Sequence, residues 1–293
     1  MKKFSRRRPS IWYAHLFFAI YMALCIVPFL MLVIVSFTDE AAILNNGFAL
    51  IPEKWSLEAY KAIFRDPGTM VQSYWITAVT SIGGSIFSIV VMAMLGYAIS
   101  RKHFVLRKPI SIMLIITMLF SGGLIPTYII QTQWFGLIDN IWCFFLNSTV
   151  AAYTVFIFRT FFATLPAALY ESAELDGASE MQILVKIVVP LSTAVIATYT
   201  FMQLVGRWNN FEICLYYITN PKLYTLQYLL QNILNEAAFL AELKSTMGVA
   251  GVLMPSETLK YAMCVVASLP MLIVFPYFQR YFAKGVTIGS VKG

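Results

Sequence analysis

The sequence predicts an all-α integral membrane protein with six transmembrane helices, and three observations favour that fold class. Of the 293 residues, 59% are hydrophobic and 12% are charged, and the mean hydropathy is +0.74. Several apolar runs reach the length of about 20 residues that a helix needs to cross a bilayer. The basic residues concentrate in alternate connections between these runs, which is typical of a multi-pass protein.

Six segments qualify as membrane spans, and each is predicted to be one helix. The first follows a cluster of five basic residues, as a signal peptide does. Its apolar stretch is too long and lacks a small-residue cleavage pattern, so we expect an uncleaved anchor. Pro126 lies inside the third segment, where a proline is expected to kink the helix. The segments are residues 11–37, 73–99, 110–131, 140–164, 187–206 and 259–282.

The distribution of Lys and Arg sets the predicted orientation. With the N-terminus inside, 14 of the 21 basic residues fall in cytoplasmic tails and connections, and the others fall in longer external loops. The positive-inside rule therefore places the tails 1–10 and 283–293 in the cytoplasm. A basic rim against anionic lipid explains the net charge of +7, so no nucleic acid is required as a partner.

Two long loops, residues 38–72 and 207–258, are predicted to be external, and acidic residues outnumber basic ones in both. In the second loop, apolar side chains recur at helical spacing from Leu226 to Leu240, which predicts an amphipathic helix. For any single residue of such a helix, packing is the commoner role. The helix as a whole also suits contact with an external partner.

The second span carries small and hydroxyl-bearing residues at helical spacing, which predicts close packing of helix backbones in lipid. The four cysteines lie apart in or beside apolar segments and are expected to act as small hydrophobic residues. Neither they nor the two histidines have metal-ligand spacing, so no metal site is predicted. The small and hydroxyl-bearing residues are Thr77, Ser81, Gly84, Ser85, Ser88 and Gly96.

Polar groups gather at the outer end of the fifth span, in Gln203, Arg207, Trp208 and Asn209. Polar side chains at membrane depth are costly unless they face a cavity or a partner. Trp208 fits an interfacial anchor somewhat better than a substrate path. For Gln203 and Asn209 the two interpretations fit equally well, and Arg207 is either a charge at a cavity mouth or one at the outer interface.

A polar, acidic island at residues 165–190 separates the fourth and fifth spans. Pro166 suits the first turn of a helix, and Gly177 supplies the left-handed conformation that ends one. Ser179 with Gln182 forms a capping-box pattern that begins a second helix. A turn between spans needs only a few residues, so two capped helices predict a docking surface for a soluble partner.

The island contains the pattern Glu-x-Ala-x3-Gly-x9-Ile-x-x-Pro, which begins at Glu171. It resembles the EAA motif of permease subunits in binding-protein-dependent ABC importers, with Ser172 in place of the usual alanine. Residues 120–126, residues 208–211 and the tail 284–293 are similar to segments of carbohydrate-importer permeases of the maltose-permease class. The resemblance therefore extends over most of the chain.

The resemblance implies the type I ABC importer permease fold, with the island as its cytoplasmic coupling helix. In this family the coupling helix inserts into a groove of an ATP-binding subunit. By position, Glu171 and Glu174 are expected to contact basic residues there, and Gly177 is expected to permit the turn. The positions that the resemblance assigns to coupling are Glu171, Ala173, Glu174, Asp176, Gly177, Ala178, Ile187 and Pro190.

The resemblance also implies the partners of the chain. These are a second, homologous permease, two ATP-binding subunits, an external solute-binding protein, an oligosaccharide and the lipid of a bacterial inner membrane. The tail residues Thr287, Gly289 and Lys292 are expected to reach the ATPase interface. The sequence has no GxxxxGK[ST] motif, so ATP and Mg are expected in the partner subunits and this chain is not expected to be an enzyme.

The cargo implied by the resemblance is an oligosaccharide, with alginate fragments as one candidate, because the chain is similar as a whole to a permease of an alginate importer. No individual residue indicates which sugar is carried. Two other classes of protein fit the hydropathy, a secondary transporter and a passive pore. A secondary transporter usually has repeated halves and buried ionisable groups, and neither class explains the capped acidic island.

Overall fold

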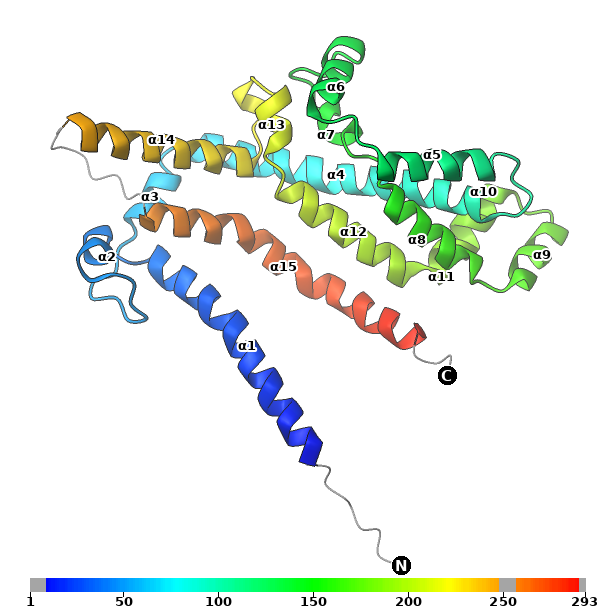
Figure 1. The fold of residues 1–293 in the computed structure, drawn as a ribbon, viewed down its shortest axis with the longest axis horizontal. Coiled ribbons are helices and arrows are strands. Elements are labelled where there is room, and N and C mark those ends of the chain that lie inside the picture. The colour runs from blue at the N-terminus through cyan, green and yellow to red at the C-terminus, as the bar shows by residue number, and fades with distance from the viewer. Residues whose placement is uncertain (1–8, 248–256, 290–293) are drawn as a thin grey trace, which may run out of the picture. The chain divides into compact units, whose positions relative to one another are not determined.

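The computed structural model describes residues 9–247 and 257–289, and almost all of these are helical (Figure 1). Within these two ranges the single β-type pairing is an antiparallel bridge between Thr38 and Trp55. The predicted all-α class is therefore confirmed. The chain divides into two compact units, Met1–Pro67 with Asn232–Leu269 and Gly68–Gln231 with Pro270–Gly293.

The first unit contains the N-terminal helices and parts of α14 and α15. α1 is mostly apolar around its whole circumference, as expected of a helix surrounded by lipid. Asp39 caps α2 by accepting a hydrogen bond from the backbone N–H of Ala41 at 3.2 Å, and Lys54 pairs with the same carboxylate at 3.0 Å. The helices are α1 (Pro9–Ser36), α2 (Glu40–Asn46), α3 (Glu58–Ile63), α14 (Leu226–Met247) and α15 (Glu257–Gly289).

The second unit contains the remaining helices, and its longest is α4, whose buried residues share one apolar core with α5, α8, α9 and α10. Figure 1 shows α9 and α10 near the end of α4 that leads into α5. The helices are α4 (Pro67–Ser100), α5 (Arg107–Leu119), α6 (Leu124–Ile129), the π-helix η1 (Ile130–Trp134), α7 (Trp142–Leu146), α8 (Ala152–Ala163), α9 (Ala167–Leu175), α10 (Glu180–Ile183), the π-helix η2 (Leu184–Val188), α11 (Val189–Leu191), α12 (Thr193–Trp208), α13 (Glu212–Tyr217) and the 3-10 helix η3 (Pro221–Leu223).

Three helices of the described chain are long and apolar enough to cross a membrane unbroken: Trp12–Ser36, Pro67–Ser100 and Glu257–Tyr281. Two further candidates are bent pairs of helices. Ala152–Ala163 and Ala167–Leu175 meet at 78°, and Glu180–Leu191 and Thr193–Trp208 meet at 86°. The number of six spans therefore stays a prediction, whereas the expectation that each span is one continuous helix is wrong.

The third and fourth predicted spans are each interrupted. The third breaks between α5 and α6, where Gly123 has φ +83°. This break precedes Pro126, which instead lies in the first turn of α6, a position where its missing N–H is tolerated. The fourth breaks between α7 and α8, where Ser148 has φ +56°. In both cases the helix ends at an extended residue, Phe120 or Asn147, and a residue with a positive φ follows before the next helix begins.

The fifth predicted span begins with the π-helix η2 and bends sharply after α11. Pro190 lies in α11, and a proline removes one backbone donor and pushes against the carbonyl four residues earlier. Such a disruption accounts for the π-helix and for the bend, since sharp kinks occur at prolines and π-bulges. The straight part of the span is α12, which starts only at Thr193.

Candidate functional site

The acidic island forms a helical hairpin, which consists of α9, the turn 176–179 and α10 and is here called the coupling hairpin after the role predicted for it. The backbone N–H of Ala178 donates to the carbonyl of Ala173 at 2.9 Å, and that of Gly177 donates to Glu174 at 3.1 Å. These two bonds are the Schellman pattern of a helix end. Gly177 has φ +76°, the left-handed conformation that a glycine adopts without a steric penalty.

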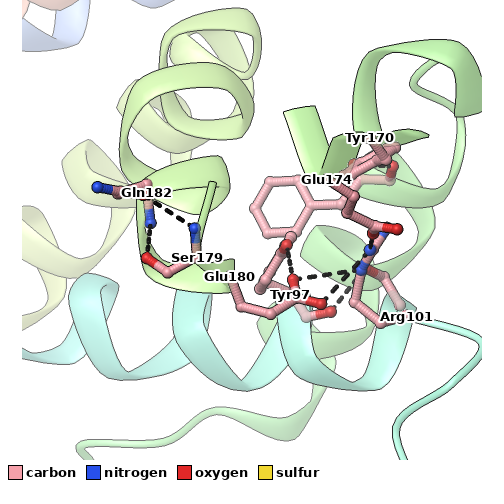
Figure 2. A network of polar contacts seen from close by, with 9 residues as sticks. Tyr97, Arg101, Tyr170, Glu174, Ser179, Glu180 and Gln182 are labelled. Atoms are coloured by element: carbon pink, nitrogen blue, oxygen red, sulfur yellow. Dashed lines mark hydrogen bonds and ion pairs between the residues drawn. The ribbon is translucent and has the colours of Figure 1, made fainter. Parts of the chain in front are cut away.

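The second arm of the hairpin starts with the predicted capping box. The backbone N–H of Gln182 donates to the Ser179 hydroxyl at 3.3 Å, and the Gln182 side chain accepts from the Ser179 N–H at 2.9 Å (Figure 2). Both bonds satisfy donors that a helix start would otherwise leave free. The sequence-based assignment of the two helices and their turn is therefore confirmed.

The inner side of the hairpin is fixed to the core of the second unit. Tyr170 and Ala173 of α9 are each 8% exposed, and Ile183 of α10 is 1% exposed. They pack in one apolar cluster with Phe158 and Phe162 of α8. Full burial of a large apolar side chain contributes about 1.5–3 kcal/mol, so Ile183 alone is a substantial anchor. The hairpin is consequently a seated element and not a free loop.

A polar network joins the hairpin to the end of α4 (Figure 2). Arg101 forms an ion pair with Glu174 of α9 and a second, at 3.4 Å, with Glu180 of α10. The hydroxyl of Tyr97 donates to the carboxylate of Glu180. The Arg101 guanidinium also lies 4.7 Å from the ring centre of Tyr170, within the range of a cation–π contact.

The predicted coupling residues divide into an outward and an inward set. Glu171 and Asp176 are exposed and make no side-chain hydrogen bond or ion pair within the part of the chain that is described. Glu174 is exposed as well, but it is held by Arg101 of the same chain. Ala178 and Ile187 are partly buried against the core, with Pro190 exposed beside the bend.

Sequence reasoning missed the partners of the hairpin. Arg101 entered only as one charge of a cytoplasmic connection, and Tyr97 only as part of the second span. Glu180 stands directly after the capping serine, where an acidic side chain favours a helix start, and that signal was not used. No local pattern connects Arg101 to Glu174, which is 73 residues away.

The predicted outer polar cluster consists of Gln203, Arg207, Trp208 and Asn209, and the structure contradicts the expectation for its Trp208. Its side chain is 4% exposed and its ring lies 6.5 Å from that of Tyr74 in α4. The interpretation as an interfacial anchor is therefore wrong, because protein and not lipid headgroup surrounds the ring. Asn209 is exposed and accepts a hydrogen bond from Gln227 at 3.2 Å, while Gln203 is half-buried in α12.

Arg207 binds inside the second unit. Its guanidinium donates to the Ser88 hydroxyl at 2.6 Å, to the carbonyl of Asn147 at 3.5 Å and to the carbonyl of Phe144. A Cβ on Gly84 would lie 2.8 Å from this guanidinium, so the glycine provides the space for it. The cation thus satisfies carbonyls at the C-terminal end of α7, where a positive charge is favourable.

Other predicted residues have fewer contacts. Thr287 and Gly289 lie within α15, which continues past the expected end of the span at residue 282, and Lys292 lies outside the described residues.

The four cysteines divide by exposure. Cys143 and Cys214 are fully buried, whereas Cys25 and Cys264 are exposed. Among the described residues no group of three or more His, Cys, Asp or Glu side chains is arranged to hold a metal ion.

Residues 94–288 match the family described as "Binding-protein-dependent transport system inner membrane component". The chain belongs to this family. The matched residues contain the coupling hairpin, Arg101 and the outer polar cluster. A member of this family is a multi-pass subunit of an inner-membrane transport system, and membership implies a binding protein, ATP-binding subunits and a second permease as partners.

Two relatives and one solved structure illustrate the similarity. The polygalacturonan/rhamnogalacturonan transport system permease protein YtcP of Bacillus subtilis (strain 168) is 34% identical over 277 residues, which cover 94% of this chain and 96% of that protein. Protein LplC of the same organism is 35% identical over 273 residues, covering 92% and 90%.

The solved structure is described as the crystal structure of a bacterial ABC transporter involved in the import of the acidic polysaccharide alginate. One of its chains aligns with a TM-score of 0.79 at 24% identity, over 96% of this chain and 100% of that chain. At this identity the likeness concerns the fold. The predicted ABC importer permease fold is therefore confirmed.

Proposed function

We propose that this chain is the transmembrane permease subunit of an ATP-driven importer that moves an oligosaccharide from an external binding protein into the cytoplasm. The observation that carries the proposal is the coupling hairpin, a capped pair of helices with a buried inner side and exposed carboxylates. In this role the chain contributes no catalytic residue. ATP and Mg bind in the two partner ATPase subunits.

The outward set of the hairpin forms the proposed ATPase contact. Glu171 and Asp176 are exposed without polar partners in the described chain, so they suit basic residues of a second protein. Glu174 differs, because Arg101 already neutralises it. We therefore assign Glu174 to holding the hairpin on α4 and the other two carboxylates to the partner. Ala173, Ala178, Ile187 and Pro190 support the hairpin from beneath and at the bend, and Thr287, Gly289 and Lys292 belong to the same interface.

The proposed topology follows the charge distribution. Residues 11–282 form the membrane domain, with external loops at 38–72 and 207–258, and both tails lie in the cytoplasm. The complex pairs this chain with one homologous permease above two ATPases. In this arrangement the coupling hairpin lies on the cytoplasmic side, where closure of ATPases on ATP moves it, and the outer polar cluster faces the binding protein.

The proposed cargo is a saccharide. YtcP is named for polygalacturonan and rhamnogalacturonan, and the solved importer is described as acting on alginate. Both names support an oligosaccharide substrate for this chain, with alginate fragments as one specific candidate. Gln203 and Asn209 near the outer end of α12 remain our candidates for the substrate path, with Trp208 and Arg207 supporting its wall.

Reconstitution into liposomes tests the proposal directly. The chain is combined with the second permease, the ATPases and the binding protein, and uptake of a labelled oligosaccharide is measured with ATP and without it. We expect uptake only when ATP is present inside. Equal uptake without ATP would identify a secondary transporter or a passive pore and would overturn the proposal.

The turn of the hairpin gives a sharper test in the variant Gly177→Val. A side chain in the left-handed conformation costs about 1–2 kcal/mol, and more for a β-branched residue, so the turn should deform. We expect normal membrane insertion, continued ATP hydrolysis and loss of uptake. Gly136→Val is the matched control, because Gly136 also has a positive φ of +60° and no neighbour within 4 Å. Loss of coupling in both variants, or in neither, would contradict the role of the turn.

A further inference from the structure

A cleft of about 180 Å³ lies in the second unit, between α6, the two residues that follow α7, and α13 with the residue Asn210 before it. It is smaller than the roughly 300–1,000 Å³ of pockets for drug-sized ligands, so it suits one ring and not a chain of rings. In the proposed topology all its residues lie at the outer ends of spans or in an external loop. The lining residues are Leu124, Thr127, Asn147, Ser148, Asn210, Glu212, Ile213, Tyr216 and Tyr217.

Contacts on the far side of the lining residues fix the walls. Tyr217 is 2% exposed and stacks on Tyr128 with ring centres 5.7 Å apart. The side-chain oxygen of Asn210 accepts the backbone N–H of Ile213 at 3.0 Å, which leaves its NH2 group as a donor. The carbonyl of Asn147 is held by Arg207 at 3.5 Å. The cleft is therefore preformed.

The lining groups match the chemistry of a sugar ring. Tyr216 is 36% exposed and offers an aromatic face together with a hydroxyl group. Asn147 and Asn210 offer amides, and Glu212 offers a carboxylate that accepts two or more hydroxyl donors. A pyranose has C–H groups on its faces and hydroxyls around its edge, so an aromatic plane beside amides and a carboxylate satisfies both.

The charge of the lining limits the kind of sugar. Glu212 is acidic, and none of the described Lys or Arg residues lines the cleft. Arg207 does not compensate it, because its guanidinium is bound to Ser88 and to backbone carbonyls. Two like charges about 4 Å apart repel by about 1 kcal/mol in water and by more near a protein surface. A uronate ring would therefore bind poorly here.

We propose that this cleft is an outer subsite for one neutral, hydroxyl-rich ring of the transported saccharide, with Glu212 selecting against a uronate at that position. The proposal rests on the proposed function and deepens it. A cargo that contains a neutral ring places that ring in this cleft and carries any acidic rings elsewhere, and a cargo made only of uronate rings, such as an alginate fragment, leaves the cleft unfilled.

Protection of a cysteine tests binding without transport. Ser148→Cys is made in a chain whose exposed cysteines, Cys25 and Cys264, are changed to Ala, and it is labelled from outside with a membrane-impermeant maleimide in the assembled complex without ATP. The probes are α-1,4-linked galactotriose and trigalacturonate, which differ only in oxidation at C6. We expect galactotriose to slow labelling several-fold and trigalacturonate to have little effect. Labelling of Gln133→Cys, at an exposed position of η1 outside the cleft, should not respond to either sugar.

The variant Glu212→Gln tests the selectivity. Removal of the charge should lower the concentration of trigalacturonate that gives half-maximal protection roughly tenfold, relative to the concentration of galactotriose that does so. Glu236→Gln, an exposed site in α14, is the matched control and should leave the ratio unchanged. An unchanged ratio in Glu212→Gln would overturn the assignment of Glu212.

The outcomes separate this inference from the proposed function. Unaffected labelling of Ser148→Cys by either sugar, in a complex that still shows ATP-dependent uptake, overturns the subsite and leaves the function intact. Protection by the sugar-free binding protein alone would mark a docking surface and would also overturn it. Protection by galactotriose in a complex without ATP-dependent uptake would support the subsite while the proposed function fails.

Discussion

Arg101 is one cation serving two carboxylates on different helices. Its side chain is only 16% exposed, and it lies between Glu174 of α9 and Glu180 of α10. An exposed ion pair contributes about 0–1 kcal/mol, because holding two long side chains costs entropy. Here the cation is already ordered by Tyr170 and by the first pair, so the second pair is formed at a lower entropic cost.

Replacement of this cation should loosen the hairpin without unfolding the chain. In Arg101→Gln the two carboxylates lose their shared partner, and we expect uptake per ATP hydrolysed to fall several-fold while the melting temperature of the complex falls only slightly. Lys102→Gln, at the next and exposed position, is the control for lost positive charge. The same coupling ratio in both variants would show that Arg101 does not hold the hairpin.

Asp139 supplies a pH-dependent contact between the turn before α7 and the segment after α13. Its carboxylate accepts bonds from the Thr219 hydroxyl and from the backbone N–H groups of Thr219 and Asn220, and the hydroxyl bond is the largest cause that lowers its pKa below 3.8. A lowered folded pKa means that the contact stabilises the fold above pH 4 and that this is lost as the pH falls through the folded pKa.

The variant Asp139→Asn removes that ionisation. We expect it to melt at a lower temperature than the parent chain at pH 7, and the difference to shrink as the pH falls below about 4. Thermal unfolding of the detergent-solubilised protein from pH 7 to pH 3 measures it. A difference that stays constant over this range would contradict the assignment.

At the scale of elements, α4 and α8 are in close contact at Gly96. A Cβ there would lie 2.7 Å from the Cβ of Phe158 and 3.2 Å from backbone atoms of Val155 and Arg159. Backbone cannot move aside as a side chain does, so the two helices would have to separate. This confirms the prediction that small residues of the second span allow close packing, and it shows which neighbour requires the glycine.

The same geometry predicts opposite outcomes for two similar substitutions. Gly96→Ala should destabilise the protein by about 1–3 kcal/mol, the usual cost of overpacking. Gly206→Ala in α12 meets no neighbour within 4 Å and should be neutral or stabilising by up to about 1 kcal/mol, because alanine favours a helix. The melting temperatures of the two purified variants, each compared with that of the parent chain, test this prediction. Equal changes in both variants would contradict the packing argument.

At the scale of the whole molecule, local signals predicted local structure well. The proline and glycine around α9 and the Ser179–Gln182 pair identified the coupling hairpin before its geometry was known. Hydropathy located the three long apolar helices of the first, second and sixth predicted spans, because the length of an apolar run follows from bilayer thickness. The helical spacing from Leu226 onward likewise identified α14.

Features that depend on distant residues could not be predicted in this way. Hydropathy has no term for the positive φ at Gly123 and Ser148, so it joined helices that the backbone separates. Trp208 was assigned to the interface because its burial depends on Tyr74 in another helix. The cleft beside Glu212 combines residues from three segments that are far apart in the sequence.

The bend after Leu191 has a mechanical consequence. The segment Glu180–Leu191 and the segment Thr193–Trp208 are nearly perpendicular, at 86°. A shift of the first segment along its own axis therefore moves the second segment sideways, perpendicular to the axis of the second segment. Near the C-terminal end of the second segment, Arg207 donates hydrogen bonds to the carbonyls of Phe144 and Asn147 at the C-terminal end of α7. In the proposed topology, a push on the coupling hairpin from the cytoplasmic side thus becomes a lateral displacement at the outer end of α12.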